Sequence, residues 1–327
     1  MKIRTFVLSI SALAIVVSVF ILPSRDSNKE ESTLNTKIEA VEATEQTLLF
    51  GGDVMLSREI GAIMERRNDF AFPFARVASL MRKADLTIVN LEGPISDKGI
   101  NQGSIYSFRA NPRAVETLQT GGIDAVSLAN NHIYDYGPEA LLDTLANLTR
   151  AKIGFTGAGK DFASAHAPYI VLSKGVRFAF LSYTNLLPSF LGKRERSPAI
   201  ALFNEAILVE DIQKAKEKAD TVVVLFHFGE EYQLVHNAVQ ERMARMAIDE
   251  GATLVVGHHP HVPQDSEWYK GGFIAYSLGN LVFDQNFGDT KRGLLLEAKF
   301  KGKNLEAVHE IPIAFSANYE PYVVEGR

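Results

Sequence analysis

From Leu48 onward, short apolar runs alternate with longer segments whose apolar residues recur every three or four positions. The short runs predict strands, and the periodic segments predict amphipathic helices. A chain patterned in this way folds as sheet with connecting helices, so the sequence predicts an α/β domain. The early half alternates strand and helix, whereas the late part is mostly strands.

The predicted elements are as follows. Strands are expected at Leu48–Gly51, Leu86–Val89, Ala125–Leu128, Ile170–Leu172, Phe178–Leu181, Thr221–Phe226, Thr253–Val256, Phe273–Ser277, Leu294–Ala298 and Glu306–Ile311. Helices are expected at Phe74–Lys83, Pro112–Gln119, Pro138–Arg150, Asn204–Lys218 and Asn237–Glu250. Two of these helices begin at a proline, which suits the first helical turn.

The composition excludes several classes of site. Cysteine is absent, which removes thiolate zinc sites, iron–sulfur clusters, thiol nucleophiles and disulfides. The 34 Lys and Arg against 39 Asp and Glu give a net charge of −5, so there is no electrostatic case for nucleic acid as a partner. With 46% apolar residues the chain can bury a large core, which excludes a disordered protein.

The first residues predict a membrane anchor. Lys2 and Arg4 precede an apolar run from Phe6 to Leu22, which reaches the short limit for a membrane span. Residues 21–23 (Ile-Leu-Pro) stand where a small-x-small cleavage site would be needed, so a retained anchor is favoured over a cleaved signal. The basic residues before the run place the N-terminus in the cytoplasm. We therefore expect residues 1–23 to be a signal anchor of a single-pass cell-membrane protein with its bulk extracytoplasmic.

The next segment, residues 24–46, is rich in Ser, Thr, Glu, Lys and Asn and carries only scattered apolar residues. This composition is typical of a flexible linker. Residues 47–327 then form the folded domain.

Five predicted strands run directly into residues that can bind a metal ion. These residues are Asp53; Asn90 and Glu92; Asn130, Asn131 and His132; His227; and His258, His259 and His261 around Pro260. In α/β sheets the loops at the carboxyl ends of strands converge on one crevice, so the five segments can meet. Their oxygen and imidazole ligands suit Mn, Fe, Zn or Co better than Ca or Mg.

Each of these features also has a purely structural interpretation. A single Asp after a strand, such as Asp53, is more often a turn or cap residue, and His227 could be a hydrogen-bonded core histidine. The segment His258–His261 is the strongest signal, because three imidazoles within four residues are hard to explain as ordinary surface. The joint pattern therefore favours a metal site.

Other polar residues carry weaker signals. Arg109 could bind an anionic substrate group, since a guanidinium matches a carboxylate or phosphate, or it could be a surface residue. The remaining histidines follow no strand in this pattern and are interpreted as structural: His166, His236 and His309. Without Cys or a Gly-x-Ser-x-Gly motif, water bound to metal is the favoured nucleophile.

Several of these segments together resemble a known family. They are Gly52-Asp53-Val54-Met55, Val89-Asn90-Leu91-Glu92-Gly93-Pro94, Leu128-Ala129-Asn130-Asn131-His132, Gly257-His258-His259-Pro260-His261-Val262 and Ser277-Leu278-Gly279-Asn280. The chain resembles, in order from about residue 47 to 290, the CapA/PgsA family of poly-γ-glutamate capsule biosynthesis proteins. That family is similar to the calcineurin-like metallophosphoesterases. The resemblance implies an α/β/β/α sandwich of two sheets flanked by helices, preceded by an N-terminal membrane helix.

The resemblance also implies roles for individual residues. His132 matches the histidine that acts as an acid near the leaving group, and Asn90 is a possible extra ligand. Two divalent transition ions (Mn, Fe or Zn) are implied, and the matching ligands are Asp53, Glu92, Asn131, His227, His259 and His261. Asp135 could orient His132 or could be a turn residue. The chain departs from the wider superfamily at Met55, where Asp-x-His is usual, and in the spacing of Glu92, which leaves the bridging ligand open.

The function expected from the sequence is that of a membrane-anchored protein in capsule poly-γ-glutamate synthesis or export, with a metal-dependent hydrolase site. One alternative is a polymer-binding or export subunit without catalysis, and another is an extracytoplasmic phosphoesterase. The expected partners are an anionic polymer such as poly-γ-glutamate, other membrane subunits of a capsule synthase complex, and the membrane itself through the N-terminal helix.

Overall fold

The computed structural model describes residues 44–187 and 199–324. The expected signal anchor at residues 1–23 and nearly all of the expected linker at 24–46 lie outside these ranges. Within the described ranges, no helix combines the length and the apolar character needed to cross a bilayer. The first strand begins at Glu45, just before the expected start of the folded domain.

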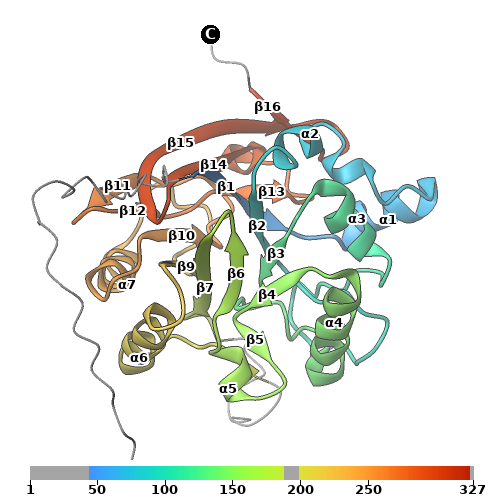
Figure 1. Ribbon diagram of the computed structural model, residues 1–327. Coiled ribbons are helices and arrows are strands. Elements are labelled where there is room, and N and C mark those ends of the chain that lie inside the picture. The colour runs from blue at the N-terminus through green and yellow to red at the C-terminus, as the bar shows by residue number, and fades with distance from the viewer. Residues whose placement is uncertain (1–43, 188–198, 325–327) are drawn as a thin grey trace, which may run out of the picture. The chain divides into compact units, whose positions relative to one another are not determined.

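One sheet has eight strands and contains the beginning and the end of the described chain (Figure 1). Its order is β16-β15-β14-β1-β2-β3-β4, and β13 pairs with β1 in addition. Strands β1 to β4 run parallel, whereas β14, β15 and β16 are antiparallel to their neighbours. The strands are β1 Glu45–Val54, β2 Leu86–Leu91, β3 Ala125–Ser127, β4 Gly154–Thr156, β13 Asn280–Val282, β14 Arg292–Lys301, β15 Asn304–Phe315 and β16 Pro321–Val323.

The second sheet has six strands in the order β11-β12-β10-β9-β7-β6. Its central strands β7, β9, β10 and β12 are parallel, and the edge strands β6 and β11 are antiparallel. The strands are β6 Tyr169–Ser173, β7 Val176–Thr184, β9 Thr221–His227, β10 Leu254–His258, β11 Ser266–Tyr269 and β12 Gly272–Ala275. A separate two-stranded pair consists of β5 Ala158–Gly159 and β8 Ala199–Ile200.

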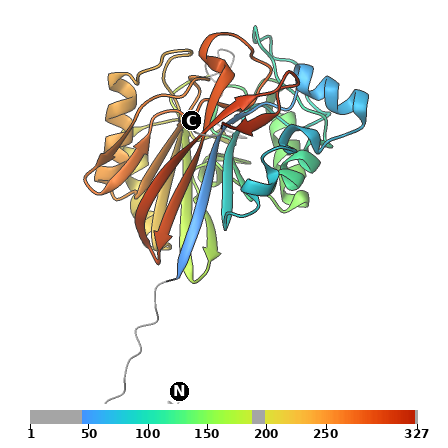
Figure 2. The same cartoon turned by 90° about the horizontal axis from the view of Figure 1, so that it is seen from above.

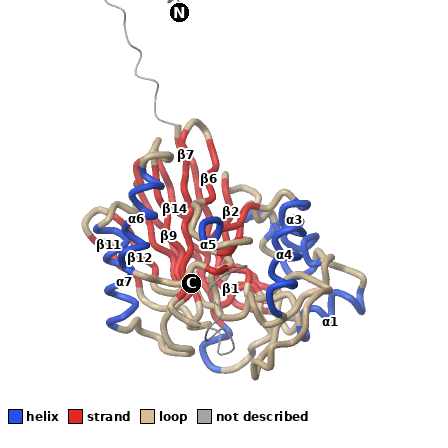
Figure 3. Tube along the Cα trace, turned by 90° about the horizontal axis from the view of Figure 1, so that it is seen from below, coloured by secondary structure: helices blue, strands red, loops and turns tan. Residues whose placement is uncertain are grey.

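Helices cover the outer faces of both sheets, as the views in Figures 2 and 3 show. The helices are α1 Arg58–Arg67, η1 Phe72–Phe74, α2 Ala78–Met81, α3 Ala114–Gly121, α4 Gly137–Ala151, α5 Phe162–Ala165, α6 Glu205–Lys216, α7 Ala238–Asp249 and η2 Gly288–Lys291. Helices α6 and α7 start at the N-cap residues Asn204 and Asn237, whose side chains accept hydrogen bonds from the first-turn N–H groups.

Three apolar layers hold the fold together, and strand β9 contributes residues to two of them. Its residues Val222, Val224 and Phe226 belong to the layer under α6 and α7, whereas Val223 and Leu225 belong to the layer between the two sheets. Successive strand residues point to opposite faces, so a parallel strand buried on both faces must be apolar throughout. A third layer packs the first sheet against α1 to α4. The predicted arrangement of two sheets flanked by helices is confirmed.

The predicted elements differ from the structure in detail. Every predicted strand overlaps an observed one, but the helix predicted at Phe74–Lys83 was wrong as one element. It is two short pieces, η1 and α2, and Val77 between them is the N-cap of α2, with a φ of −117° that departs from the ideal helical value. The elements that were not predicted are α1, α5, η2 and the short strands β4, β5, β8, β11, β13 and β16.

Candidate metal centre

Three predicted ligands come from the ends of neighbouring strands in the first sheet. The parallel register of β1 and β2 pairs Asp53 with Asn90, and β13 pairs Asn280 with Asp53 on the other side. Glu92 directly follows β2, and Asn131 lies in the loop after β3. The carboxyl edge of this sheet therefore gathers the residues expected there.

A close contact between two backbone segments brings Asn280 to Asp53. The Asp53 N–H donates to the carbonyl oxygen of Gly279 at 3.0 Å. A Cβ at Gly52 would lie 1.8 Å from that same oxygen. Only glycine at position 52 permits this approach.

The second sheet contributes the histidines. His227 ends β9 and is paired in register with His258 at the end of β10. The chain then turns through His259 (φ +99°) and His261 (φ +58°), a backbone region that residues with side chains rarely adopt. The N–H of His259 donates to Oδ2 of Asp53 at 3.1 Å, which ties this loop to the first sheet. Such strain at residues other than glycine is typical of functional sites.

Asp53 is completely buried and lies at the centre of these contacts. Its Oδ1 accepts a hydrogen bond from Asn90 Nδ2 at 2.7 Å, and its Oδ2 lies 3.3 Å from Nδ1 of His261. Burial alone would raise the pKa of Asp53, but the hydrogen bond and charge of His261 and the charge of His227 outweigh burial. The pKa therefore falls well below its usual range, and Asp53 is a carboxylate at neutral pH.

Glu92 is buried, and neither of its carboxylate oxygens has a hydrogen-bond partner among the described residues. Its Oε1 lies 3.8 Å from Nε2 of His261 and 3.7 Å from Nε2 of His132. Burial is the main reason that the pKa of Glu92 is raised to about 7, and His261 acts in the opposite direction. Burial would lower the pKa of His261, but the charges of Glu92 and Asp53 raise it to about 9.

His227 and His259 are held as neutral imidazoles. Nε2 of His227 lies 2.8 Å from Oδ1 of Asn131, and Nδ1 of His259 is buried without a hydrogen-bond partner among the described residues. Burial, with the charge of neighbouring histidines, lowers the pKa of His227 well below its usual range and that of His259 to about 3. Neutral imidazole is the form that binds metal ions.

His132 is oriented by Asp135. Nδ1 of His132 lies 2.8 Å from Oδ2 of Asp135, a buried carboxylate that also accepts the Phe108 N–H at 2.8 Å. The Phe108 ring packs against the imidazole with centroids 4.1 Å apart. Nδ1 of His132 is thus engaged by Asp135, and Nε2 is the ring nitrogen that faces Glu92. Of the two interpretations of Asp135, the geometry supports the orienting one.

Three neighbours of the cluster have hydrogen-bond partners of their own, and those of Asn90 include the cluster residues Asp53 and His227. The buried sulfur of Met55 accepts from the N–H and the hydroxyl of Ser57 at 3.2 and 3.0 Å. The amide of Asn90, besides its bond to Asp53, accepts from Asn130 Nδ2 at 3.2 Å. The ring nitrogens of His258 lie 3.2 and 3.3 Å from backbone carbonyls on β1 and β9, so this residue bridges the two sheets.

Arg109 lies outside this hydrogen-bond network. Its guanidinium donates to the carbonyl oxygens of Lys98 and Gly99 at 3.1 and 3.4 Å and stacks over Tyr136 at 4.1 Å. The other histidines also belong to separate surroundings: His166 contacts Asp211, His236 contacts Asp265, and His309 lies on β15.

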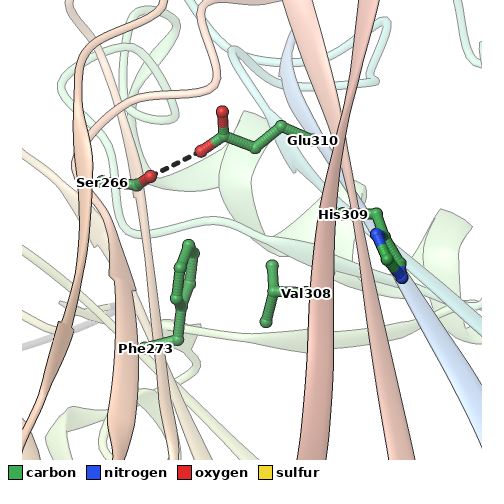
Figure 4. A pocket seen from close by; sticks show the side chains of 5 residues that line it. All are labelled: Ser266, Phe273, Val308, His309 and Glu310. Carbon is green, nitrogen blue, oxygen red and sulfur yellow. Dashed lines mark hydrogen bonds between the residues drawn. The ribbon is translucent and has the colours of Figure 1, made fainter.

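Two cavities lie away from the cluster. One, of about 320 Å³, lies against β15 and is lined by Ser266, Phe273, Val308, His309 and Glu310 (Figure 4). Val308 and Glu310 share one face of β15, and Glu310 accepts the Ser266 hydroxyl at 2.6 Å. The other cavity, of about 630 Å³, has four lysines among its lining residues: Lys83, Lys174, Lys299 and Lys301.

The residues of the cluster fit a divalent transition metal. Asp53, Glu92 and His261 offer donor atoms that all lie within 4.8 Å of one another. The oxygens of Glu92 and the Nδ1 of His259 are buried polar atoms without partners among the described residues, and a cation would satisfy them.

Two further residues join the cluster without having been predicted. Asn280 places its Oδ1 3.0 Å from Nδ1 of His261, and it follows a predicted strand as the other site residues do, so the same signal could have found it. Glu231 lies in the loop after β9, and its carboxylate is close to His259 and His261. No strand-end signal marks Glu231 in the sequence.

The fold is an α/β/β/α sandwich of two sheets, with histidines, carboxylates and amides gathered at one edge of the sheets. A crystal structure of a hypothetical protein from Thermus thermophilus matches with a TM-score of 0.51 and 19% identity, covering 86% of this chain and 100% of that one. A 5′-nucleotidase precursor from the same organism matches with a TM-score of 0.50 and 16% identity, covering 85% of this chain and 56% of that one. These likenesses concern the fold alone.

The chain belongs to the bacterial capsule synthesis protein family PGA_cap, whose model matches residues 47–285. It is 32% identical over 275 residues to the capsule biosynthesis protein CapA of Bacillus anthracis, covering 82% of this chain and 67% of that protein. It is 31% identical over 267 residues to the PGA biosynthesis protein CapA of Bacillus subtilis (strain 168), covering 81% of this chain and 70% of that protein. The family resemblance read from the sequence is thereby confirmed.

Proposed function

We propose that this protein acts in the synthesis or export of capsule poly-γ-glutamate and carries a metal-dependent hydrolase site. The names of the two CapA relatives support the pathway. The observation that carries the hydrolase site is Glu92, a buried carboxylate without a hydrogen-bond partner among the described residues, facing His261 and His132. The apolar run from Phe6 to Leu22 supports a membrane anchor with the domain outside the cytoplasm.

The metal would be held by ligands of three kinds. Asp53 and Glu92 supply carboxylates, and His227, His259 and His261 supply imidazoles, with the amide oxygen of Asn131 beside them. Two divalent ions of Mn, Fe or Zn bound there would make water a nucleophile at neutral pH and polarise the bond under attack. The low pKa of Asp53 keeps one carboxylate ionised, and the low pKa values of His227 and His259 leave their nitrogens free of protons.

His132 would supply the proton to the leaving atom. Its Nε2 faces Glu92, and Asp135 holds the ring through Nδ1 in the orientation that proton transfer needs. Phe108 covers the imidazole and limits the access of water. A site of this kind can hydrolyse either an amide bond of the polymer or a phosphoester bond. The experiment below therefore also tests for extracytoplasmic phosphoesterase activity.

A second candidate function is polymer binding or export without catalysis, beside other membrane subunits of a capsule synthase complex. The cavity of about 630 Å³ has four lysines against three acidic residues, Glu45, Asp85 and Glu306, among its lining. Lys174 is paired with Asp85 and Lys299 with Glu297, so Lys83 and Lys301 are the lysines that this candidate function relies on. Poly-γ-glutamate carries a carboxylate on every residue, and lysines match such a polyanion electrostatically. Arg109 remains a candidate contact for the polymer.

The test measures the metal content of the purified full-length protein by elemental analysis, beside the Asp53→Ala/His261→Ala variant. His309→Ala serves as a control that removes an imidazole outside the cluster. Hydrolysis of poly-γ-glutamate and of a generic phosphodiester is assayed on the same samples. Metal in the wild type and the control, with metal-dependent turnover, would support the hydrolase. Bound metal without turnover would favour the binding role, and no metal after reconstitution would exclude the metal centre.

A further inference from the structure

The loop after β9 brings an additional carboxylate to the metal centre. Residues Glu230 to Val235 in this loop are exposed, whereas Glu92, His259 and His261 are buried. The carboxylate of Glu231 nevertheless lies with the ring nitrogens of His259 and His261 in one group, whose atoms are all within 4.8 Å of one another. Glu231 therefore approaches the cluster from the solvent side.

Two backbone hydrogen bonds hold this loop against the loop after β10. The Phe228 N–H donates to the carbonyl oxygen of His258 at 3.1 Å, and the Tyr232 N–H donates to that of Pro260 at 2.8 Å. Tyr232 takes a left-handed backbone conformation (φ +65°) at this point. Since residues on both sides of Glu231 are anchored to the segment that carries His259 and His261, its position beside them is built into the backbone.

Charge balance favours a third carboxylate at this position. Two divalent cations bring four positive charges, and the buried cluster opposes them with two carboxylates, Asp53 and Glu92. A buried excess of charge is costly, so an acidic ligand at the open side lowers the free energy of the loaded site. His259, which lies in the same group as Glu231, also has a buried Nδ1 without a partner among the described residues.

We propose that Glu231 is a ligand of the metal centre and closes it on the solvent side, at the cation bound by His259 and His261. The ion is a divalent transition metal, because carboxylate and imidazole donors combine there. This inference rests on the metal centre of the proposed function and adds a ligand that the strand-end pattern does not predict.

The test compares Glu231→Gln with Glu230→Gln in the full-length protein. Both variants remove one negative charge from an exposed position in the same loop, but only Glu231 lies in the histidine group. Affinity for Mn²⁺ and Zn²⁺ is measured by isothermal titration against a competing chelator, at low and at high salt. We expect Glu231→Gln to weaken one binding event at least about tenfold relative to Glu230→Gln, as lost contacts to a metal site do. The difference persists at high salt, because coordination is not screened as a remote charge effect is.

Glu231→Asp is the conservative variant and should recover part of the affinity. Equal affinities of the Glu231→Gln and Glu230→Gln variants, while the wild type binds metal, would overturn the role of Glu231 and leave the metal centre intact. A wild-type protein that binds no metal would instead refute the proposed function itself. Far-UV circular dichroism of the metal-free variants verifies that each is folded.

Discussion

Replacing Glu92 by Gln should stabilise the metal-free protein at alkaline pH while abolishing its metal binding. The pKa of the buried carboxyl rises from 4.5 to about 7 on folding, chiefly through burial. Since a tenfold change in an ionisation constant is worth about 1.4 kcal/mol, the ionised carboxylate costs the folded state about 3 kcal/mol at pH 8 and above. The neutral amide of Gln has the same shape and carries no such cost.

The effect has a definite pH dependence. Between pH 4.5 and about 7 the folded protein binds more protons at Glu92 than the unfolded chain, so its stability falls as pH rises through this range. The advantage of the Gln variant should therefore be near zero at pH 4.5, grow up to about pH 7, and stay level above it. Urea denaturation in excess chelator, at several pH values, measures the difference.

A matched control is Glu306→Gln, an exposed position on β15. It should change the free energy of unfolding by less than about 0.5 kcal/mol at every pH. If Glu92→Gln proved less stable than the wild type at pH 8 without metal, the attraction between Glu92 and the charged His261 would outweigh the cost of burial. The argument that Glu92 needs a cation would then fail. With metal added, only the wild type and the control should gain stability.

Three further predictions follow from the same geometry. His132→Ala should lower turnover about 10²- to 10⁴-fold with unchanged metal content, because the imidazole transfers a proton and its ring is oriented by Asp135; a parallel loss of metal would contradict this role. Gly52→Ala should destabilise the fold severely in thermal melts, since its Cβ would lie 1.8 Å from the Gly279 carbonyl oxygen, and a normal melting temperature would show that β1 and the Gly279 segment can separate. Metal affinity should weaken about tenfold per pH unit from pH 9 down to 7 and about a hundredfold per unit below 7, as the His261 proton (pKa about 9) and then the Glu92 proton (pKa about 7) must be displaced; calorimetry in buffers of different ionisation enthalpy counts the released protons.

The sheets could be predicted from the sequence because their strands are apolar runs buried on both faces. The run at 221–226 is an example, since both of its faces lie in apolar layers. Strand β13 could not be predicted in this way, because it has only three residues and forms by pairing with β1. Helix α1 was missed although the sequence carries signals for it, with Ser57 at the N-cap, Glu59 in the first turn and Arg66 and Arg67 in the last.

The site was predictable where a ligand directly follows a strand. Asp53 is the last residue but one of β1 and His227 is the last of β9, so the topology alone carries them to one edge. Glu231 lies four residues beyond its strand, and its place depends on the hydrogen bond from Tyr232 to Pro260, a contact between two loops. Arg109 illustrates the opposite case, because a residue type suited to anions is engaged by nearby carbonyl oxygens and an aromatic ring.

The candidate ligands are divided between the two sheets, with Asp53, Glu92 and Asn131 following strands of one and His227, His259 and His261 following strands of the other. An ion bound by both halves acts as a cross-link over the apolar layer that separates them. Coupling of this kind is reciprocal. The free energy by which the bound ion stabilises the packing of the sheets equals the free energy by which that packing strengthens the binding of the ion. A truncation inside the apolar layer, such as Val223→Ala, thus weakens the affinity for the ion without touching its ligands. Removing the ion with a chelator in turn lowers the stability of the packed layer.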